Sequence, residues 1–224
     1  MSAHEAAPHE EKPLGRMVPP VPHGVEIPPE SPDVGGRALY VASRLLAGAT
    51  TFFFLAFLFA YFYLRSINQD HMWRPAHVNP DHGLGAAIVA CVLLSAALAI
   101  LAGRHMKRDF SGWLAPAILA LGLGLTAVGL QCVEYTVQRF GPTNGAYASV
   151  FCAWTGFYAI AVLGTMYWLE TQIATELRAR RAPAEHGDIH DPDRLIAPGL
   201  DACVFFWAYL AAIGAIAYVT LYLL

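Results

Sequence analysis

Residues 38–64 read ALYVASRLLAGATTFFFLAFLFAYFYL and contain a single charged side chain, that of Arg44. A helix needs about 20 apolar residues to cross the ~30 Å hydrocarbon layer of a membrane. Four more apolar runs of spanning length follow, at residues 83–103, 112–137, 146–169 and 200–224. Because backbone amides in lipid must pair within their own segment, long continuous runs favour helices over the short strands of a barrel. We therefore expect an all-α, polytopic membrane protein with five transmembrane helices.

The composition supports a membrane protein and argues against several other classes. Of the 224 residues, 56% are hydrophobic and only 14% are charged, whereas soluble domains have about 25% charged residues. The net charge of −3 offers no basic excess for nucleic acid. The cysteines lie in apolar runs without a CxxC pair, so we expect small buried hydrophobes rather than disulfides, a thiol relay or a zinc site. They are Cys91, Cys132, Cys152 and Cys203.

The N-terminal residues differ from the rest. Residues 1–36 hold eight of the 15 prolines and six acidic residues. Proline fixes φ and removes a backbone donor, so these residues predict an extended tail. No apolar stretch follows Met1, so we expect no cleavable signal peptide. We divide the chain at the Gly35-Gly36 pair into a Pro-rich tail, residues 1–37, and a five-helix membrane domain, residues 38–224.

The basic residues predict the orientation. If the N-terminus is cytoplasmic, ten basic residues face the cytoplasm and three face outward, with Arg44 inside the first span. The ten are Lys12, Arg16, Arg37, Arg104, Lys107, Arg108, Arg178, Arg180, Arg181 and Arg194; the three are Arg65, Arg74 and Arg139. The positive-inside rule then places the N-terminus in the cytoplasm and the C-terminus in the periplasm. Residues 170–181 are expected to continue the fourth helix on the cytoplasmic side.

Histidine placement bears on redox chemistry. All nine histidines lie in the tail, in loops or at the end of a span. The membrane interior therefore offers no imidazole for haem or copper, and we expect no catalytic residue, metal ligand or cofactor in this chain. His186 and His190 stand four residues apart beside acidic side chains, a spacing that suits a metal if the segment is helical. Because that segment contains Gly187 and precedes Pro192, a solvated polar loop is the favoured interpretation.

Three ionisable residues in the spans are candidates for a role, because a charge in hydrocarbon is costly. Arg44 can anchor its helix at the interface or bind a lipid headgroup. Asp201 is expected to cap the fifth helix. Glu134 lies close to the outer surface, where an ion pair with Arg139 or a hydrogen bond is favoured over proton transfer. No series of acidic residues crosses the bilayer, which argues against a self-contained pump.

Small residues and bulky residues are concentrated in different spans. Small residues crowd the second, third and fifth runs, where they let helix backbones approach. The first run instead carries aromatic residues over positions 52–63. These side chains can face lipid, a partner helix or a lipid-filled groove.

Two segments resemble a known family. Leu130-Gln131-Cys132-Val133-Glu134-Tyr135, followed by a glycine turn, Tyr147-Ala148-Ser149-Val150-Phe151 and Thr155-Gly156-Phe157, is similar to consecutive motifs of cytochrome c oxidase subunit III. The aromatic run Phe53–Phe62 and Trp73-Arg74-Pro75 also resemble that family. Three positions depart from it: Thr50 replaces a carboxylate, and Tyr158 and Ala161 replace histidines.

The resemblance implies the short bacterial form with five helices, located in the cytoplasmic (inner) membrane. Such a subunit has no redox centre and docks on subunit I, in a complex with subunit II and cytochrome c, where haem and copper reside in the partner subunits. The family binds phospholipids and protects the catalytic subunit while oxygen is reduced to water and protons are translocated. An accessory subunit of a quinol oxidase or nitric oxide reductase is an alternative, and an independent small transporter is another. Our structural or lipid-contact candidates are Arg44, Gln131, Glu134, Tyr135, Tyr147, Ser149, Thr155, Tyr158 and Asp201.

Overall fold

The computed structural model describes residues 32–67, 73–109, 112–181 and 192–224, which form helices joined by turns and contain no strand. The helices are α1 (Pro32–Ser66), α2 (His82–Asp109), α3 (Leu114–Val137), α4 (Ala146–Arg181) and α5 (Pro192–Tyr218). A π-helical turn, η1 (Val219–Leu223), continues α5. All five α-helices contain a stretch long and apolar enough to cross a membrane. The expected all-helical architecture with five such helices is confirmed.

Two helices begin earlier than the sequence suggested. Helix α1 starts at Pro32 and runs through Gly35 and Gly36, so the predicted break at that pair is wrong. Proline suits the first turn of a helix, where its missing N–H has no intrahelical partner, and glycine weakens a helix without ending it. Helix α5 starts at Pro192 and includes Pro198, which removes one backbone bond. Helix α4 extends to Arg181, which confirms the expected continuation over residues 170–181.

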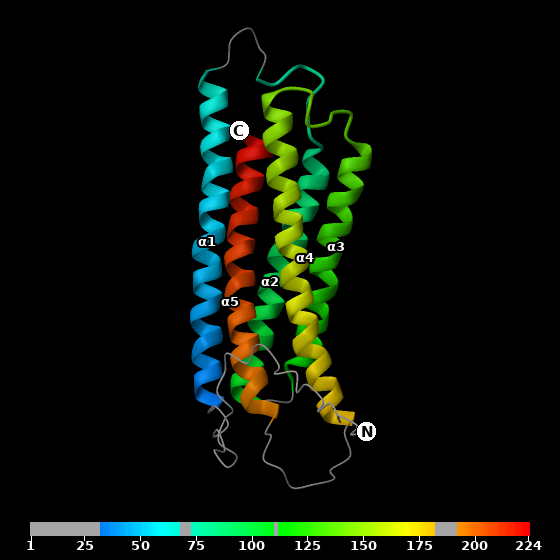
Figure 1. The fold of residues 1–224 in the computed structure, drawn as a ribbon. Coiled ribbons are helices and arrows are strands. Elements are labelled where there is room, and N and C mark those ends of the chain that lie inside the picture. Colours follow the sequence, from blue (N-terminus) through cyan, green and yellow to red (C-terminus); the bar gives the residue numbers. More distant parts are fainter. Residues whose placement is uncertain (1–31, 68–72, 110–111, 182–191) are drawn as a thin grey trace, which may run out of the picture. The chain divides into compact units, whose positions relative to one another are not determined.

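Successive helices run in alternating directions (Figure 1). Helix α1 packs against α5 and α4, and α2 packs against α3 and α5. The start of α1, the end of α2 and the end of α4 lie at one end of the bundle, which we call the basic end (Figure 1). Its basic residues include Arg37, Arg104, Lys107, Arg108 and Arg178. The opposite end holds residues 73–81, residues 138–145 and the end of α5.

Glycines lie where helices approach closely, among them Gly85, Gly124 and Gly214. An added Cβ at Gly85 would lie 2.4 Å from the Tyr222 ring, and one at Gly214 would lie 2.3 Å from the Tyr158 hydroxyl. An added Cβ at Gly124 would lie 2.1 Å from the Met166 sulfur. In lipid, helices associate by close packing because burial brings no hydrophobic gain. The glycines therefore set the positions at which α2, α3 and α5 contact large side chains.

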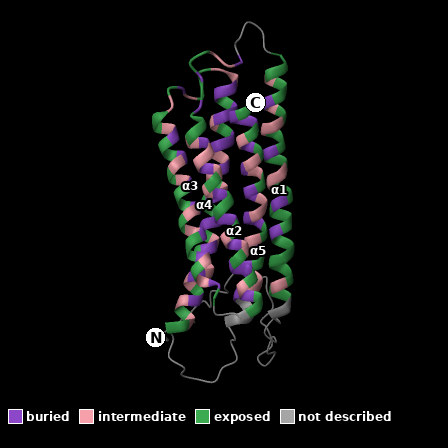
Figure 2. Cartoon of the chain, turned by 180° about the vertical axis from the view of Figure 1, so that it is seen from behind, coloured by how far each residue is buried: buried purple, intermediate pink, exposed green. Residues whose placement is uncertain are grey.

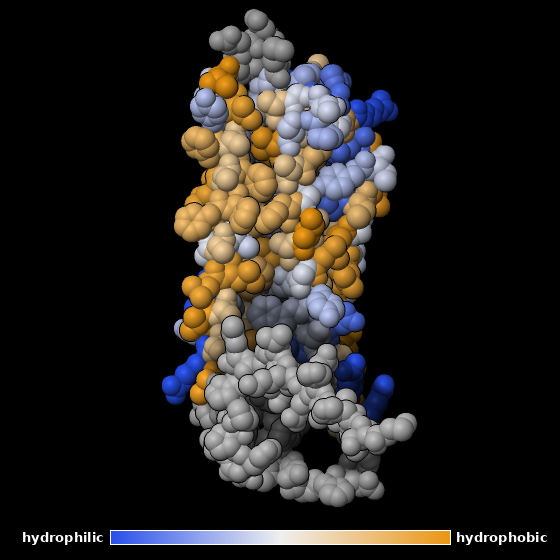
Figure 3. Space-filling model, in the orientation of Figure 1, coloured by the Kyte–Doolittle hydropathy of each residue, from blue (hydrophilic) through white to orange (hydrophobic). Residues whose placement is uncertain are grey.

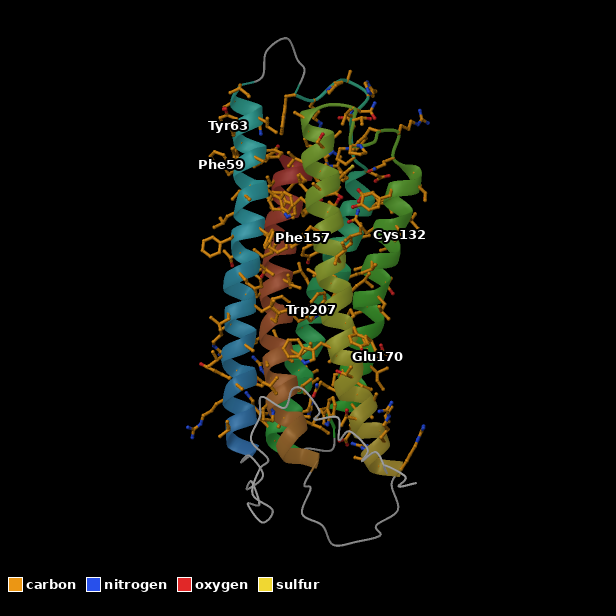
Figure 4. All side chains as sticks on the ribbon, in the orientation of Figure 1. Phe59, Tyr63, Cys132, Phe157, Glu170 and Trp207 are labelled. Atoms are coloured by element: carbon orange, nitrogen blue, oxygen red, sulfur yellow. The ribbon has the colours of Figure 1, made fainter. Side chains whose placement is uncertain are left out.

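The aromatic run of α1 has two different faces. Phe54 and Tyr61 are buried, and Phe53 stacks on Phe157 of α4 with ring centroids 5.1 Å apart. Phe59 is 69% exposed, and Figure 4 shows it pointing away from the bundle together with Tyr63. Much of α1 is exposed, whereas buried residues gather where the other helices meet (Figure 2).

The surface shows the same division between apolar middle and polar ends. On the face seen in Figure 3, hydrophobic side chains cover the middle of the bundle, and hydrophilic side chains gather toward its two ends. This pattern fits helices that span a membrane.

Candidate functional site

The most unusual feature of the interior is a buried carboxylate at the opposite end of the bundle. Glu134, on α3, is 1% exposed. The Tyr222 hydroxyl lies 2.7 and 2.8 Å from its two oxygens, and the side-chain amide of Gln131 donates to it at 2.7 Å. Residues three apart on a helix share a face, which is why Gln131 can reach Glu134. A buried charge is costly unless it is hydrogen-bonded, and these donors meet that requirement.

The hydrogen-bond alternative for Glu134 is therefore confirmed, and the ion pair with Arg139 is wrong. Within the described ranges, the salt bridges are Lys107–Asp201 and Arg180–Glu176. Glu134 faces the interior, toward η1, whereas Arg139 follows the end of α3. A helix ending between two residues separates their side chains even when they are close in sequence.

Tyr147 extends this polar cluster to the start of α4. Its hydroxyl donates to the backbone carbonyl of Leu221 in η1. Its ring meets those of Tyr61 and Trp73 edge-on, and the Arg74 guanidinium lies 4.6 Å from its centroid. Tyr147 is completely buried, so one side chain joins α1, the 73–81 loop and the C-terminal turn.

Two further hydroxyl contacts tie α4 to its neighbours. Thr155 donates to the carbonyl of Phe151 at 2.7 Å, so the Tyr135 hydroxyl, 2.7 Å from the Thr155 oxygen, acts as the donor in their contact. Tyr158 donates to the carbonyl of Leu210 on α5 at 3.0 Å. Three helices are thus joined by bonds in which each proton has a definite acceptor.

Ser149 lies outside the buried cluster. It is exposed, and its hydroxyl donates to the carbonyls of Pro142 and Gly145. Gly145 has a φ of 131°, a conformation that side-chain-bearing residues rarely adopt. Ser149 therefore closes the α3–α4 turn.

The remaining candidates lie at the basic end. Asp201 does not cap α5, because the helix begins at Pro192; its carboxylate instead pairs with Lys107 of α2 at 2.7 Å. Arg44 is exposed, donates to the carbonyl of Tyr40 at 3.0 Å and stacks 3.2 Å from that ring's centroid. The structure thus separates Arg44 and Asp201 from the buried cluster.

The positions that depart from the family pattern have ordinary partners. Thr50 bonds to the carbonyl of Leu46 at 2.8 Å, and the neighbouring Thr51 hydroxyl lies 2.9 Å from that of Tyr209. Ala161 is partly buried against the core. Thr50 is uncharged, so the chain has no carboxylate at this position of the family pattern.

Metal-ligating and thiol groups are dispersed. In the described part of the chain, no three His, Cys, Asp or Glu side chains are grouped to hold a metal ion. His186 and His190 lie outside the described residues. The four cysteines are free, and Cys203 is buried, but Cys132 is exposed, so the expectation of burial is wrong there. Cys132 faces outward on α3 (Figure 4).

Several partners were not identified from sequence. Tyr222 is separated from Glu134 by 88 residues, and no local pattern links them. The Trp207 indole donates to the Ser95 hydroxyl at 3.1 Å, which in turn donates to the carbonyl of Ala120. The sequence offers one signal for this last contact: Ser95 is a polar residue within an otherwise apolar run.

These observations define a class: a multi-pass helical membrane protein whose spans are joined by buried hydrogen bonds. A family model described as "Cytochrome c oxidase subunit III" matches residues 36–224, and the chain belongs to that family. The chain is 23% identical over 193 residues to cytochrome c oxidase subunit 3 of Tachyglossus aculeatus aculeatus, covering 84% of this chain and 67% of that protein. The Cyprinus carpio protein of the same name is 22% identical over 214 residues, with coverages of 93% and 72%. The Neurospora crassa protein is 28% identical over 139 residues, with coverages of 59% and 49%.

The resemblance found in the sequence is thus confirmed. Subunit III of cytochrome c oxidase is part of an oxidoreductase complex of the respiratory chain, and the chain's membership in this family implies other subunits in its complex. The motif residues Gln131, Glu134, Tyr135, Tyr147 and Thr155 all lie in the buried contacts described above.

Proposed function

We propose that this chain is the non-catalytic subunit III of a haem-copper terminal oxidase that oxidises cytochrome c, reduces oxygen to water and translocates protons. The observation that carries the proposal is the family match over residues 36–224. In this role the chain stabilises subunit I, which holds haem and copper, and binds structural phospholipids. Subunit II and cytochrome c complete the assembly.

The buried polar cluster supports a structural role for the chain. The Glu134 carboxylate accepts bonds from Tyr222 and Gln131, and Tyr147 bonds to the backbone of η1. These bonds join helix ends to one another. Such an arrangement favours a rigid docking body over a redox or proton-transferring centre in this chain.

We place the protein in a bacterial cytoplasmic membrane, with the basic end toward the cytoplasm and the C-terminus in the periplasm. The positive-inside rule supports this orientation, because Arg37, Arg104, Lys107, Arg108 and Arg178 share the basic end. Arg65, Arg74 and Arg139 lie at or near the opposite end.

Purification from native membranes tests the proposal. A tagged chain extracted in mild detergent is expected to bring with it haem-bearing polypeptides and a reduced-minus-oxidised haem spectrum. Recovery of the chain without any haem polypeptide would overturn the proposal.

The related alternative is an accessory subunit of a quinol oxidase or nitric oxide reductase, which the same preparation distinguishes. A copper site in the co-purified second subunit together with oxidation of cytochrome c supports the primary proposal. Turnover with quinol alone, or reduction of nitric oxide, supports the alternative. Substrate uptake by the isolated chain in liposomes would instead indicate a transporter.

A further inference from the structure

A small cavity lies inside the bundle, next to the buried carboxylate of Glu134. Its volume is about 30 Å³, and its lining comes from α2, α3, α4, α5 and η1. The two hydrogen-bond partners of Glu134, Gln131 and Tyr222, are both among the lining residues. One water molecule needs roughly 10–15 Å³ of such space, so the cavity has room for a water molecule.

One lining side chain carries a hydrogen-bond donor that has no partner. Trp154 of α4 lines the cavity and is 1% exposed, and its indole N–H has no acceptor within the described residues. The ring of Phe57 stacks on the indole with centroids 6.1 Å apart. Buried polar groups are nearly always paired, either with protein or with ordered water. The indole of Trp154 therefore calls for an acceptor that the protein does not supply.

A second lining side chain carries an acceptor that has no partner. The Glu134 carboxylate only accepts, so the Gln131 amide turns its nitrogen toward it, at 2.7 Å, and its oxygen lies on the other side of the amide. Within the described residues no hydrogen bond reaches that oxygen. Gln131 is 5% exposed. Its oxygen is thus a buried acceptor that calls for a donor.

Tyr158 adds a further acceptor to the same cavity. Its hydroxyl proton goes to the carbonyl of Leu210 at 3.0 Å, which leaves lone pairs on its oxygen. The lining therefore combines one N–H donor with two oxygen acceptors. Water matches this set because it accepts and donates, and a buried water makes 2–4 hydrogen bonds. An apolar occupant would leave Trp154 and Gln131 unpaired, at the cost of desolvating both groups.

We propose that one water molecule occupies this cavity, where it accepts the indole N–H of Trp154 and donates to the side-chain oxygen of Gln131 and the hydroxyl oxygen of Tyr158. The water joins α4 to α3 and holds the Gln131 amide in the orientation that its bond to Glu134 requires. Trp154 is thus a positioning residue, which acts on Glu134 through the water and Gln131. This site goes beyond the proposed function, which assigns no ligand to the interior of the bundle.

The test is an electron cryo-microscopy map at a resolution that shows ordered water. The sample is the complex recovered through a tag on this chain, with whatever subunits accompany it. The variant is W154F, which removes the N–H and keeps an aromatic ring beside Phe57. The matched control is W113F, because Trp113 is also completely buried with an indole N–H that lacks a partner among the described residues, but it does not line this cavity.

The expected result is one water peak in the cavity of the wild type and of W113F, within hydrogen-bond distance of the Trp154 indole nitrogen and the Gln131 oxygen. In W154F this peak should be lost. A role of the indole in packing alone would leave the peak in place, so a peak that persists in W154F would overturn the proposal.

The wild-type map decides the question even if W154F fails to fold. An empty cavity in that map would overturn the proposal. So would xenon bound in the cavity of a wild-type sample under xenon pressure, with no water peak in the unpressurised sample, because this result would show a dry apolar cavity. Recovery of the chain without haem polypeptides would defeat the proposed function and leave this test unaffected, since the map reports the interior of this chain.

Discussion

At the scale of single residues, Glu134 is a carboxylate buried among the helices. Glu134 is acceptable inside the bundle because Tyr222 and Gln131 donate to it. Removing one partner of a buried hydrogen-bonded group exposes the other to the full cost of desolvation. Substitutions here are therefore expected to affect the joining of α3 to η1 rather than the oxidase reaction.

The first prediction concerns this contact. Y222F keeps the ring against Gly85 and removes the donor, so we expect about 1–3 kcal/mol lower stability of the chain in its complex. E134A should lower the yield of assembled complex, because the donors of Tyr222 and Gln131 then lack their acceptor. Yield by gel filtration and the haem spectrum of the recovered complex provide the measurements.

In that experiment, the haem spectrum of intact complex should stay normal in both variants. Y167F is the control, since Tyr167 is 69% exposed and outside the cluster. Unchanged yield and melting temperature in E134A would contradict the structural role of Glu134.

The second prediction uses glycines with opposite surroundings. G214A would place a methyl group 2.3 Å from the Tyr158 hydroxyl, whereas nothing lies within 4 Å of a Cβ at Gly129. Overpacking typically costs about 1–3 kcal/mol, and alanine in an open helical position is favourable by up to about 1 kcal/mol.

We compare G214A and G129A by the melting temperature of the purified complex. G214A should lower it, while G129A should leave it unchanged or raise it slightly. G214A/Y158F should remain destabilised, because the ring carbon Cζ is also 2.9 Å away. A G214A protein as stable as G129A would show that α4 and α5 are not in close contact there.

At the scale of helices, α5 makes the greatest variety of contacts. Its first turns meet α2 through the Lys107–Asp201 pair, its middle accepts the Tyr158 hydrogen bond, and the η1 turn that continues it accepts the Tyr147 hydrogen bond. These ties differ in burial. We expect the buried hydrogen bonds to contribute more to stability than the exposed Lys107–Asp201 pair.

The third prediction compares the start of α5 with the η1 turn that follows its end. The side chains of Lys107 and Asp201 are 66% and 51% exposed, so D201N should change stability by roughly 0–1 kcal/mol. Y147F should have a larger effect, since it leaves the buried Leu221 carbonyl without that donor. Thermal denaturation of the complex at low and high salt separates them, because only the exposed pair is screened. A larger loss in D201N than in Y147F would contradict this ranking.

At the scale of the whole molecule, alternating helices place the basic residues of α1, α2 and α4 at one end (Figure 1). By the positive-inside rule, this distribution predicts that the basic end faces the cytoplasm. Loop positions at the two ends allow a direct test.

The fourth prediction follows from this orientation. In a variant with all four cysteines replaced by alanine, T143C lies in the α3–α4 turn and G112C lies before α3. A membrane-impermeant maleimide added to intact spheroplasts should label T143C and reach G112C only after permeabilisation. The reverse pattern would place the basic end in the periplasm.

The sequence alone determined the helical class, the number of spans and the family resemblance. Long continuous runs such as residues 38–64 satisfy their backbone in lipid as helices rather than as the short strands of a barrel, and the motifs around Glu134 and Thr155 are local in sequence. The helix starts predicted from sequence at Gly35-Gly36 and at Asp201 were wrong. The reason is that helix ends depend on whether a neighbouring helix packs against the next turn. Propensity at such positions is a weak guide.

Only the tertiary structure decided which residues meet. Tyr222 reaches Glu134 across 88 positions, and Arg44 faces Phe205 although one belongs to α1 and the other to α5. Pairings of this kind depend on how the helices pack and rotate against one another, which the composition of each run leaves open. The physical reason is that in a membrane the packing of small residues, such as Gly85 and Gly214, sets helix contacts, and each such contact needs both surfaces.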